Sequence, residues 1–172
     1  KGIIARTGGY AIYASFLIGT MIFLKTDIQI NAILIGGFII FLTGFYDDIH
    51  DLSPKLKMLG QVIAALVVII YGDIVLKGFT LPFLPDSISY VFAILVTILW
   101  IVGISNAINL IDGLDGLCAG ISIIVLVTIS LTSLTYGRTD ISSLSLLLAG
   151  AIGGFLVYNF HPASIFLGDC GA

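Results

Sequence analysis

Three short polar segments interrupt an otherwise apolar sequence, and each of them carries aspartate. They read GFYDDIHDLSPKLKMLGQ (residues 44–61), NAINLIDGLDGLCAG (residues 106–120) and NFHPASIFLGDCGA (residues 159–172). A carboxylate near the hydrocarbon of a bilayer is costly, so an ionisable residue at a membrane boundary indicates a functional site. These segments are therefore where chemistry is expected.

In the first segment, Asp47 and Asp51 are four residues apart, and Asp48 and Asp51 are three apart. If a helix continues through them, this spacing puts them on one face. Two like charges at about 4 Å repel by roughly 4 kcal/mol at an effective dielectric near 20. Adjacent acids therefore indicate a divalent cation, a shifted pKa or plain exposure to water, and the spacing is compatible with all three.

In the second segment, Asn109, Asp112 and Asp115 recur at three-residue spacing. On a helix they would fall within about a third of the circumference. Gly113 and Gly116 leave the backbone uncovered, which suits the close approach of a ligand's phosphates. The alternative is a glycine-rich turn that caps a helix, with aspartate at the N-cap.

In the third segment, Asp169 directly follows Gly168, close to the last apolar run. His161 fits a base, a phosphate contact or a merely solvated side chain. Phe166 fits either a core position or a surface on which a nucleobase stacks.

Taken together, these segments favour a hard divalent cation. Oxygen ligands without paired Cys or His favour Mg²⁺ or Mn²⁺ over zinc. Mg²⁺ usually takes one or two carboxylates and leaves its other positions to water and substrate phosphates. The remaining acids would act as a base or bind substrate, a composition that suits phosphoryl transfer.

The composition defines the class of protein that must position these residues. The chain has 172 residues, of which 59% are hydrophobic and only 10% charged, and its mean hydropathy is +1.18. Soluble domains carry about 25% charged residues, so this is predicted to be an integral membrane protein. The net charge of −3 gives no basis for a nucleic-acid partner. Cys118 and Cys170 fit neither a CxxC nor a metal-ligand spacing and are interpreted as structural thiols.

Six apolar segments approach the roughly 20 residues that a membrane-spanning helix needs. They are residues 9–24, 28–46, 56–71, 88–105, 117–136 and 144–160. The sequence thus predicts an all-α polytopic bundle of about six spans, forming one catalytic core over residues 1–172. Alternation of the loops between two membrane faces places six aspartates and both histidines on the same side. These aspartates are Asp47, Asp48, Asp51, Asp112, Asp115 and Asp169.

At these motifs the chain resembles the polyprenyl-phosphate N-acetylhexosamine-1-phosphate transferases, which are of the glycosyltransferase family 4 type. The resemblance rests on GFYDDIHDLSPKLK, NAINLIDGLDGL and FLGDCGA in that order, and RTGGYAIY (residues 6–13) is similar to the family's start of an early helix. It implies transfer of a sugar-1-phosphate from a UDP-sugar to a membrane polyprenyl phosphate, with release of UMP. It also implies Mg²⁺ and an active site facing the cytoplasm, in the inner or plasma membrane.

The resemblance also implies roles for individual residues. Asp47 matches the base for the lipid phosphate, with Asp48 beside it, and Asp112 lies with the catalytic acids. Asp169 matches a metal ligand, with Asp47 as a second one. The residues that match substrate-binding positions are Asn109 at the diphosphate, Asp115, Asn159 and Phe166 at the uridine, and Lys55 and Lys1 at phosphates.

Within the family, DLSPK and NFHPASIFLGD look more like the branch that uses UDP-N-acetylglucosamine (UDP-GlcNAc). That branch starts teichoic acid, the O-antigen of lipopolysaccharide and related cell-wall glycans. The phospho-N-acetylmuramoyl-pentapeptide transferases are the alternative. The resemblance implies a longer chain, of which this is a fragment, and leaves a homodimer open. Direct attack by the lipid phosphate and a two-step route through an aspartyl intermediate both remain open.

Two other classes of membrane protein share some of these features. An intramembrane aspartyl protease has YD and GxGD signatures, which Tyr46-Asp47 and Gly168-Asp169 partly match, but Phe166 stands where the first glycine of GxGD is required. An ion-coupled transporter would carry its acids near the membrane midplane in interrupted helices, whereas these acids are expected at one boundary. The transferase is the favoured interpretation.

Overall fold

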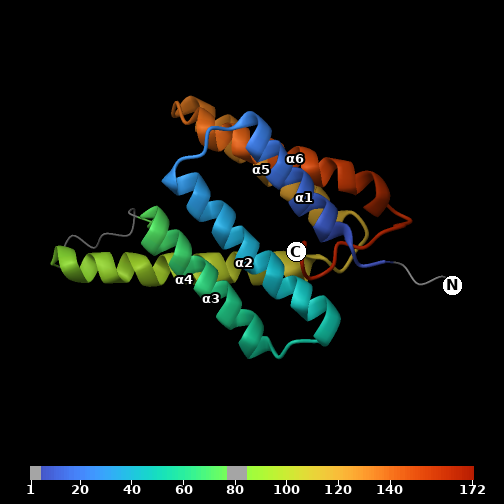
Figure 1. Cartoon of the computed structure of the whole chain (residues 1–172), viewed down its shortest axis with the longest axis horizontal. Coiled ribbons are helices and arrows are strands. Elements are labelled where there is room, and N and C mark those ends of the chain that lie inside the picture. The colour runs from blue at the N-terminus through green and yellow to red at the C-terminus, as the bar shows by residue number, and fades with distance from the viewer. Residues whose placement is uncertain (1–4, 77–84) are drawn as a thin grey trace. The chain divides into compact units, whose positions relative to one another are not determined.

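The computed structural model describes residues 5–76 and 85–172, and helices account for most of them. Their bounds are Gly8–Phe23 (α1), Ile28–His50 (α2), Pro54–Gly72 (α3), Asp86–Ile111 (α4), Leu117–Thr135 (α5) and Thr139–Asn159 (α6) (Figure 1). Within the described residues, the β-structure is limited to an isolated bridge between Ala5 and Ile165. The all-α prediction is confirmed. Lys1, a predicted phosphate contact, lies outside the described residues.

Five helices of the described chain are long and apolar enough to cross a membrane, namely α2 to α6. The first predicted span is also an apolar helix, but α1 has only 16 residues. At 1.5 Å per residue, such a helix is shorter than the hydrocarbon thickness of about 30 Å. Length and composition therefore support five of the six predicted spans.

Three helices extend beyond the limits that hydropathy predicts. α2 continues through the acidic residues to His50, α4 continues to Ile111, and α6 already begins at Thr139. A charged side chain ends an apolar run but does not break backbone hydrogen bonding, so the helix continues until a breaking conformation occurs. For α2 that point is Asp51, whose φ of 47° is left-handed and whose N–H donates to the Asp47 carbonyl.

The chain divides into two compact units, one formed by residues 26–107 and the other by residues 1–25 and 108–172. The prediction of a single catalytic core stays a prediction. In the first unit, α2 and α3 form a tightly packed hairpin. A Cβ added to Gly36 would lie 2.8 Å from Val68 Cγ2, and one added to Gly72 would lie 2.7 Å from Ala32 Cβ. Small residues thus let the two backbones approach closely, as is usual between membrane helices.

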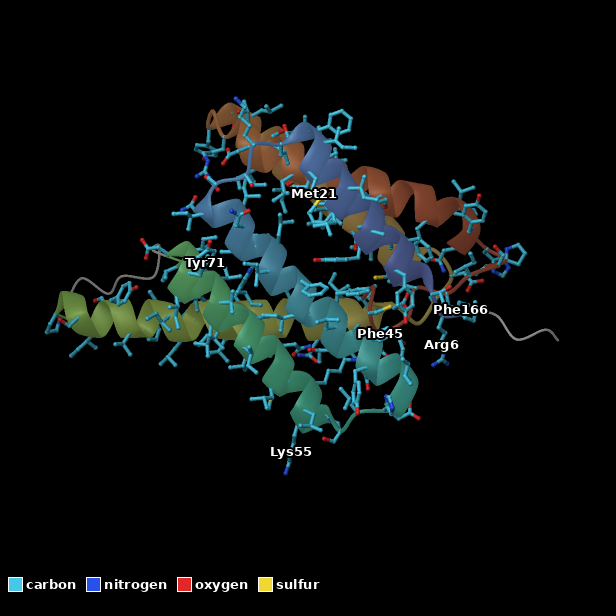
Figure 2. All side chains as sticks on the ribbon, viewed as in Figure 1. Arg6, Met21, Phe45, Lys55, Tyr71 and Phe166 are labelled. Carbon is cyan, nitrogen blue, oxygen red and sulfur yellow. The ribbon has the colours of Figure 1, made fainter. Side chains whose placement is uncertain are left out.

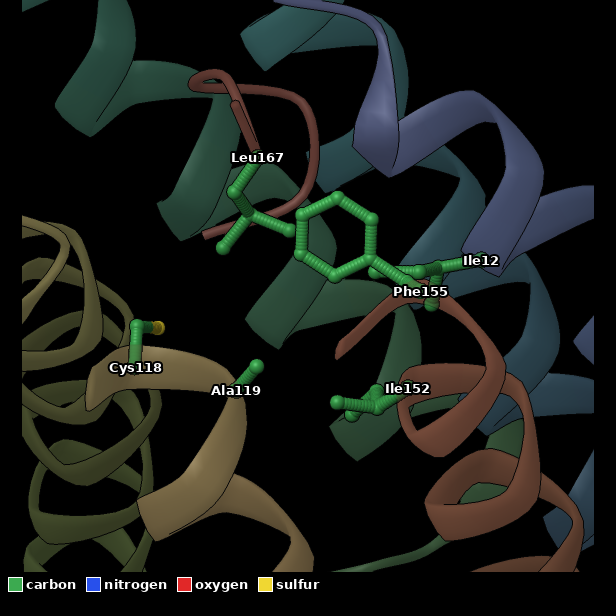
Figure 3. Packing of buried hydrophobic residues seen from close by; sticks show 6 residues of the cluster. All are labelled: Ile12, Cys118, Ala119, Ile152, Phe155 and Leu167. Atoms are coloured by element: carbon green, nitrogen blue, oxygen red, sulfur yellow. The ribbon is translucent and has the colours of Figure 1, made fainter. Parts of the chain in front are cut away.

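In the second unit, α5 and α1 both pack against α6 around a buried apolar cluster (Figures 1 and 3). The cluster is Ile12, Cys118, Ala119, Ile152, Phe155 and Leu167. Leu167 belongs to the loop after α6, so this loop is anchored in the core. Nearer the opposite ends of α5 and α6, the buried hydroxyls of Ser130 and Ser142 share a hydrogen bond of 2.7 Å.

Candidate active site

The end of α4 meets the loop that carries Asp169. Asn109 lies in the last turn of α4, and Asp112 follows directly after the helix. The Asn109 side-chain amide donates a hydrogen bond of 2.6 Å to Asp169 Oδ1. Asp112 also lies close enough to Asp169 for the two carboxyl groups to interact electrostatically.

The carboxyl of Asp112 has an unusual environment. Burial, followed by the negative charge of Asp169, raises its pKa from 3.8 to about 6. Both causes disfavour the ionised form of Asp112. A bound cation would remove this penalty, because it would neutralise two carboxylates that otherwise repel each other. The pair therefore has the electrostatic character of a cation site.

Asp115 has a different position from the one that three-residue spacing would give it on a helix. α4 ends at Ile111, so Asp115 lies in the following turn and not on the helical face of Asn109 and Asp112. Its Oδ2 accepts hydrogen bonds from the Ala163 N–H and from His161 Nδ1, both at 3.1 Å. The backbone N–H of Ala163 is the largest cause that lowers the pKa of Asp115, followed by the hydrogen bond with His161. The prediction of a shared helical face is wrong for Asp115.

Asn159 connects the turns on either side of this region. Its Oδ1 accepts a hydrogen bond of 3.0 Å from the Gly116 N–H, and its Nδ2 donates one of 3.0 Å to the Ile165 carbonyl. The residue is only 3% exposed. The oxygen and the nitrogen of its side-chain amide thus both bond to backbone groups of the protein. Its predicted contact with uridine stays a prediction.

The loop after α6 also contacts the residues just before α1. Phe166 donates its N–H to the Ala5 carbonyl at 2.9 Å, and its own carbonyl accepts from Gly8 N–H at 3.0 Å. Figure 2 shows Arg6 and Phe166 on these two neighbouring segments. The Phe166 ring is 37% exposed, so it is accessible to a ligand. Sequence reasoning identified RTGGYAIY as similar to the start of an early helix but did not predict its contact with this loop.

In the other unit, Asp47 is held from two sides near the end of α2. Its Oδ1 accepts a hydrogen bond of 2.7 Å from the Leu52 N–H, and its Oδ2 forms an ion pair of 2.9 Å with Lys57 Nζ. The two side chains are 11% and 19% exposed, respectively. Sequence reasoning missed Lys57. The available signal was its position one turn into α3, three residues after the helix start at Pro54.

The other predicted residues of the acidic segment are more exposed to solvent. Asp48 is half-buried, and Asp51 and Lys55 are exposed. Because α2 ends at His50 and Asp51 is left-handed, Asp47 and Asp51 do not share the helical face that a continued helix would give them. The Lys55 side chain extends away from the start of α3 (Figure 2).

The described residues contain no cluster of three or more His, Cys or Asp side chains arranged to hold a metal. What the structure brings together is smaller: Asp112 and Asp169 with the amide of Asn109. One or two carboxylates are the usual protein contribution to a Mg²⁺ site, whose other ligands are water and substrate phosphates. The donor set fits such a cation. Asp47 and Asp48 belong to the other compact unit.

Comparison with known proteins agrees with the class that the fold defines, an integral membrane protein built from apolar helices. Residues 30–172 match the family model described as glycosyl transferase family 4. The match covers most of the chain and includes all three acidic segments. The protein therefore belongs to glycosyl transferase family 4.

The chain is also similar to individual proteins of this family. The chain is 45% identical over 172 residues to a probable undecaprenyl-phosphate N-acetylglucosaminyl 1-phosphate transferase of Bacillus subtilis, covering 99% of this chain and 48% of that protein. It is 34% identical over 185 residues to the phospho-N-acetylmuramoyl-pentapeptide-transferase of Carboxydothermus hydrogenoformans, covering 96% and 57%. It is 33% identical to the corresponding protein of Staphylococcus carnosus, over 185 residues that again cover 96% of this chain and 57% of that protein. The chain thus spans about half the length of the curated relatives it matches.

Proposed function

We propose that this protein transfers N-acetylglucosamine-1-phosphate from UDP-GlcNAc to a membrane polyprenyl phosphate and releases UMP. The acceptor phosphate becomes part of a new diphosphate, and the product is the first lipid-linked intermediate of a cell-wall or surface glycan. The observation that carries the proposal is the Asp112–Asp169 pair beside Asn109. It supports the proposal because it would supply two carboxylates to a cation in a chain that belongs to a family of glycosyl transferases.

The proposal assigns the donor diphosphate to the end of α4. Asp112 and Asp169 would hold a Mg²⁺ ion, or Mn²⁺ in its place, and Asn109 orients Asp169 through their hydrogen bond. When bound, Mg²⁺ would neutralise charge on the diphosphate, which is the main requirement of phosphoryl transfer. The chain's own contribution is a pair of carboxylates fixed on a helix end and a loop that is anchored in the core.

The uridine is assigned to the neighbouring loop. The exposed ring of Phe166 stacks on the uracil, because an accessible aromatic face offers such a surface. Asp115 is already held by Ala163 and His161, so its carboxylate is fixed in place before it meets a hydroxyl or imide group. Asn159 supports these two residues through the backbone, in place of the direct contact that the resemblance implies.

The acceptor phosphate is assigned to the acidic segment at the end of α2. Asp47 accepts the proton of the lipid phosphate, with Asp48 beside it, and a role of Asp47 as a second metal ligand belongs to the same proposal. We assign the phosphate-binding cation to Lys57 in place of Lys55, because Lys57 lies 2.9 Å from Asp47. This active face is proposed to lie on the cytoplasmic side, where UDP-sugars are available.

The experiment that tests the proposal is a UMP-release assay with the full-length protein in membranes. UDP-GlcNAc and polyprenyl phosphate should give UMP and a lipid-linked sugar diphosphate only when Mg²⁺ or Mn²⁺ is present. Absence of turnover with every UDP-N-acetylhexosamine would refute the proposed function.

The phospho-N-acetylmuramoyl-pentapeptide reaction is the second candidate, because two of the relatives carry that name. The higher identity of 45% to the N-acetylglucosaminyl relative favours UDP-GlcNAc as donor. The same assay separates them when UDP-N-acetylmuramoyl-pentapeptide is supplied as an alternative donor. Preference for the pentapeptide donor would move the protein to the other branch and leave the assigned residues unchanged.

A further inference from the structure

The first turn of α1 is bound to the loop that carries Asp169. Gly8 N–H donates to the Phe166 carbonyl at 3.0 Å, and Gly9 N–H donates to the Leu167 carbonyl at 2.9 Å. The first N–H groups of a helix have no acceptor within the helix itself. Here they donate to the carbonyls of Phe166 and Leu167, shortly before Asp169. The hydrogen bonds thus join the start of α1 to the loop.

This contact also requires that Gly9 has no side chain. A Cβ added to Gly9 would lie 2.5 Å from Gly171 N and 2.6 Å from Cys170 Sγ. From the loop side, a Cβ added to Gly171 would lie 2.8 Å from Gly9 Cα. Two backbones therefore pack directly on each other, and backbone atoms cannot rotate away as the end of a flexible side chain can.

We propose that Gly9 is a positioning residue for Asp169, and that α1 fixes the metal-binding loop through this glycine contact. The inference rests on the proposed function, which gives Asp169 its role. Asp169 lies between the hydrogen-bonded Leu167 and the tightly packed Gly171, so both attachments act on it within two residues. Ordinary van der Waals contact needs about 3.4 Å or more, so an added methyl group displaces the loop by about 1 Å.

A displacement of that size matters for catalysis. Loss of about 1 Å in the placement of a catalytic group can reduce the rate about 100-fold. Asp169 is held by Asn109 at 2.6 Å, and a hydrogen bond of this kind weakens steeply when its atoms move apart by 1 Å. Gly9→Ala is therefore expected to weaken cation binding without contacting the cation or the substrate.

The test compares Gly9→Ala with Gly153→Ala in the full-length protein in membranes. Gly153 lies in α6, and a Cβ added there meets nothing within 4 Å, so it controls for a glycine-to-alanine change in a helix. The first readout is maleimide labelling of Cys170, mapped by peptide mass spectrometry, with Cys118 as the internal reference. The second is the Mg²⁺ concentration that gives half-maximal UMP release.

In Gly9→Ala, labelling of Cys170 should increase about fivefold or more while Cys118, which is 1% exposed in the core, stays protected. The Mg²⁺ concentration for half-maximal activity should rise about tenfold or more, and Gly153→Ala should match wild type in both. Equal labelling and equal Mg²⁺ dependence in Gly9→Ala and wild type would overturn the inference. Increased labelling of both cysteines would also overturn it, because it would indicate general unfolding.

If Gly9→Ala does not accumulate in membranes, Gly171→Ala perturbs the same contact from the loop and leaves α1 unchanged. It should expose Cys170 and raise the Mg²⁺ requirement in the same way, and wild-type behaviour would refute the inference. The labelling readout does not depend on transferase activity. If the wild-type protein released no UMP, the proposed function would fail, whereas selective exposure of Cys170 would still report on the loop contact.

Discussion

The ion pair between Lys57 and Asp47 gives a direct prediction for the acidic segment. Replacing Lys57 with Met keeps a long unbranched side chain but removes the ammonium group 2.9 Å from Asp47 Oδ2. The carboxylate would then keep the hydrogen bond of its other oxygen to Leu52 N–H. We expect it to lose the orientation that the base for the lipid phosphate requires.

The size of the effect follows from the burial of the pair. At 2.9 Å and an effective dielectric near 20, two unit charges attract by about 6 kcal/mol before desolvation is subtracted. Exposed ion pairs contribute about 0–1 kcal/mol to stability, whereas breaking a buried ion pair by removing one partner costs about 3–5 kcal/mol. The side chains are 11% and 19% exposed, so a cost of about 2–3 kcal/mol is expected. If this cost falls on the transition state, kcat/KM decreases about 30- to 150-fold.

The assay is UMP release as a function of polyprenyl-phosphate concentration. Lys57→Arg should recover part of the activity, because it restores a positive charge near Asp47. Lys55→Met removes one charge from the same helical turn and should stay within about twofold of wild type, because Lys55 is exposed. Wild-type kcat/KM in Lys57→Met together with a large loss in Lys55→Met would refute the reasoning and restore Lys55 as the phosphate-binding residue.

Four further outcomes are expected. Asp169→Asn should abolish UMP release at every Mg²⁺ concentration, and turnover at the wild-type rate would move the metal site elsewhere. Because the pKa of Asp112 is raised to about 6, protons compete with the cation below that pH. The Mg²⁺ concentration for half-maximal activity should therefore rise about tenfold per pH unit below pH 6 and be nearly constant above pH 7, a slope that pH titration measures. Asn159→Leu should lower the free energy of unfolding by about 1–3 kcal/mol, because it leaves two half-buried backbone groups without their partner, and an unchanged unfolding midpoint would contradict this. Ser142→Ala should cost about 0.6–1.7 kcal/mol through the lost hydrogen bond to Ser130, measured by unfolding in mixed detergent, with no change in KM for UDP-GlcNAc.

Hydropathy located the helices well because spanning a membrane is a strong constraint on composition. It did not locate their ends, as α2 and α4 show. The apolar runs stop near Tyr46 and Ser105, but the helices continue to His50 and Ile111. A helix ends where backbone hydrogen bonding ends, and this depends on left-handed residues such as Asp51 and on the turn after Ile111. Charge alone carries no information about that conformation.

In the candidate site, too, the sequence predicts some features and misses others. Residue type and spacing identified Asn109, Asp112 and Asp169, because oxygen-rich side chains in apolar surroundings require an explanation. The spacing failed for Asp115, since its position depends on where α4 ends. Gly9 was not identified as part of the site either, because a glycine at a helix start reveals a close contact only when the opposing loop is known.

The aspartates of the candidate site differ in what holds them, and this difference supports the assignment of the cation. Asp47 and Asp115 each accept a hydrogen bond from a backbone N–H, of Leu52 and Ala163, and each has a basic side chain beside it. These donors lower the pKa of Asp115, so that carboxylate is already stabilised as an anion and gains less from a metal ion. Asp112 is in the opposite situation, because burial and the charge of Asp169 both raise its pKa. A divalent cation is therefore expected to bind at Asp112 and Asp169, where it relieves the largest electrostatic cost.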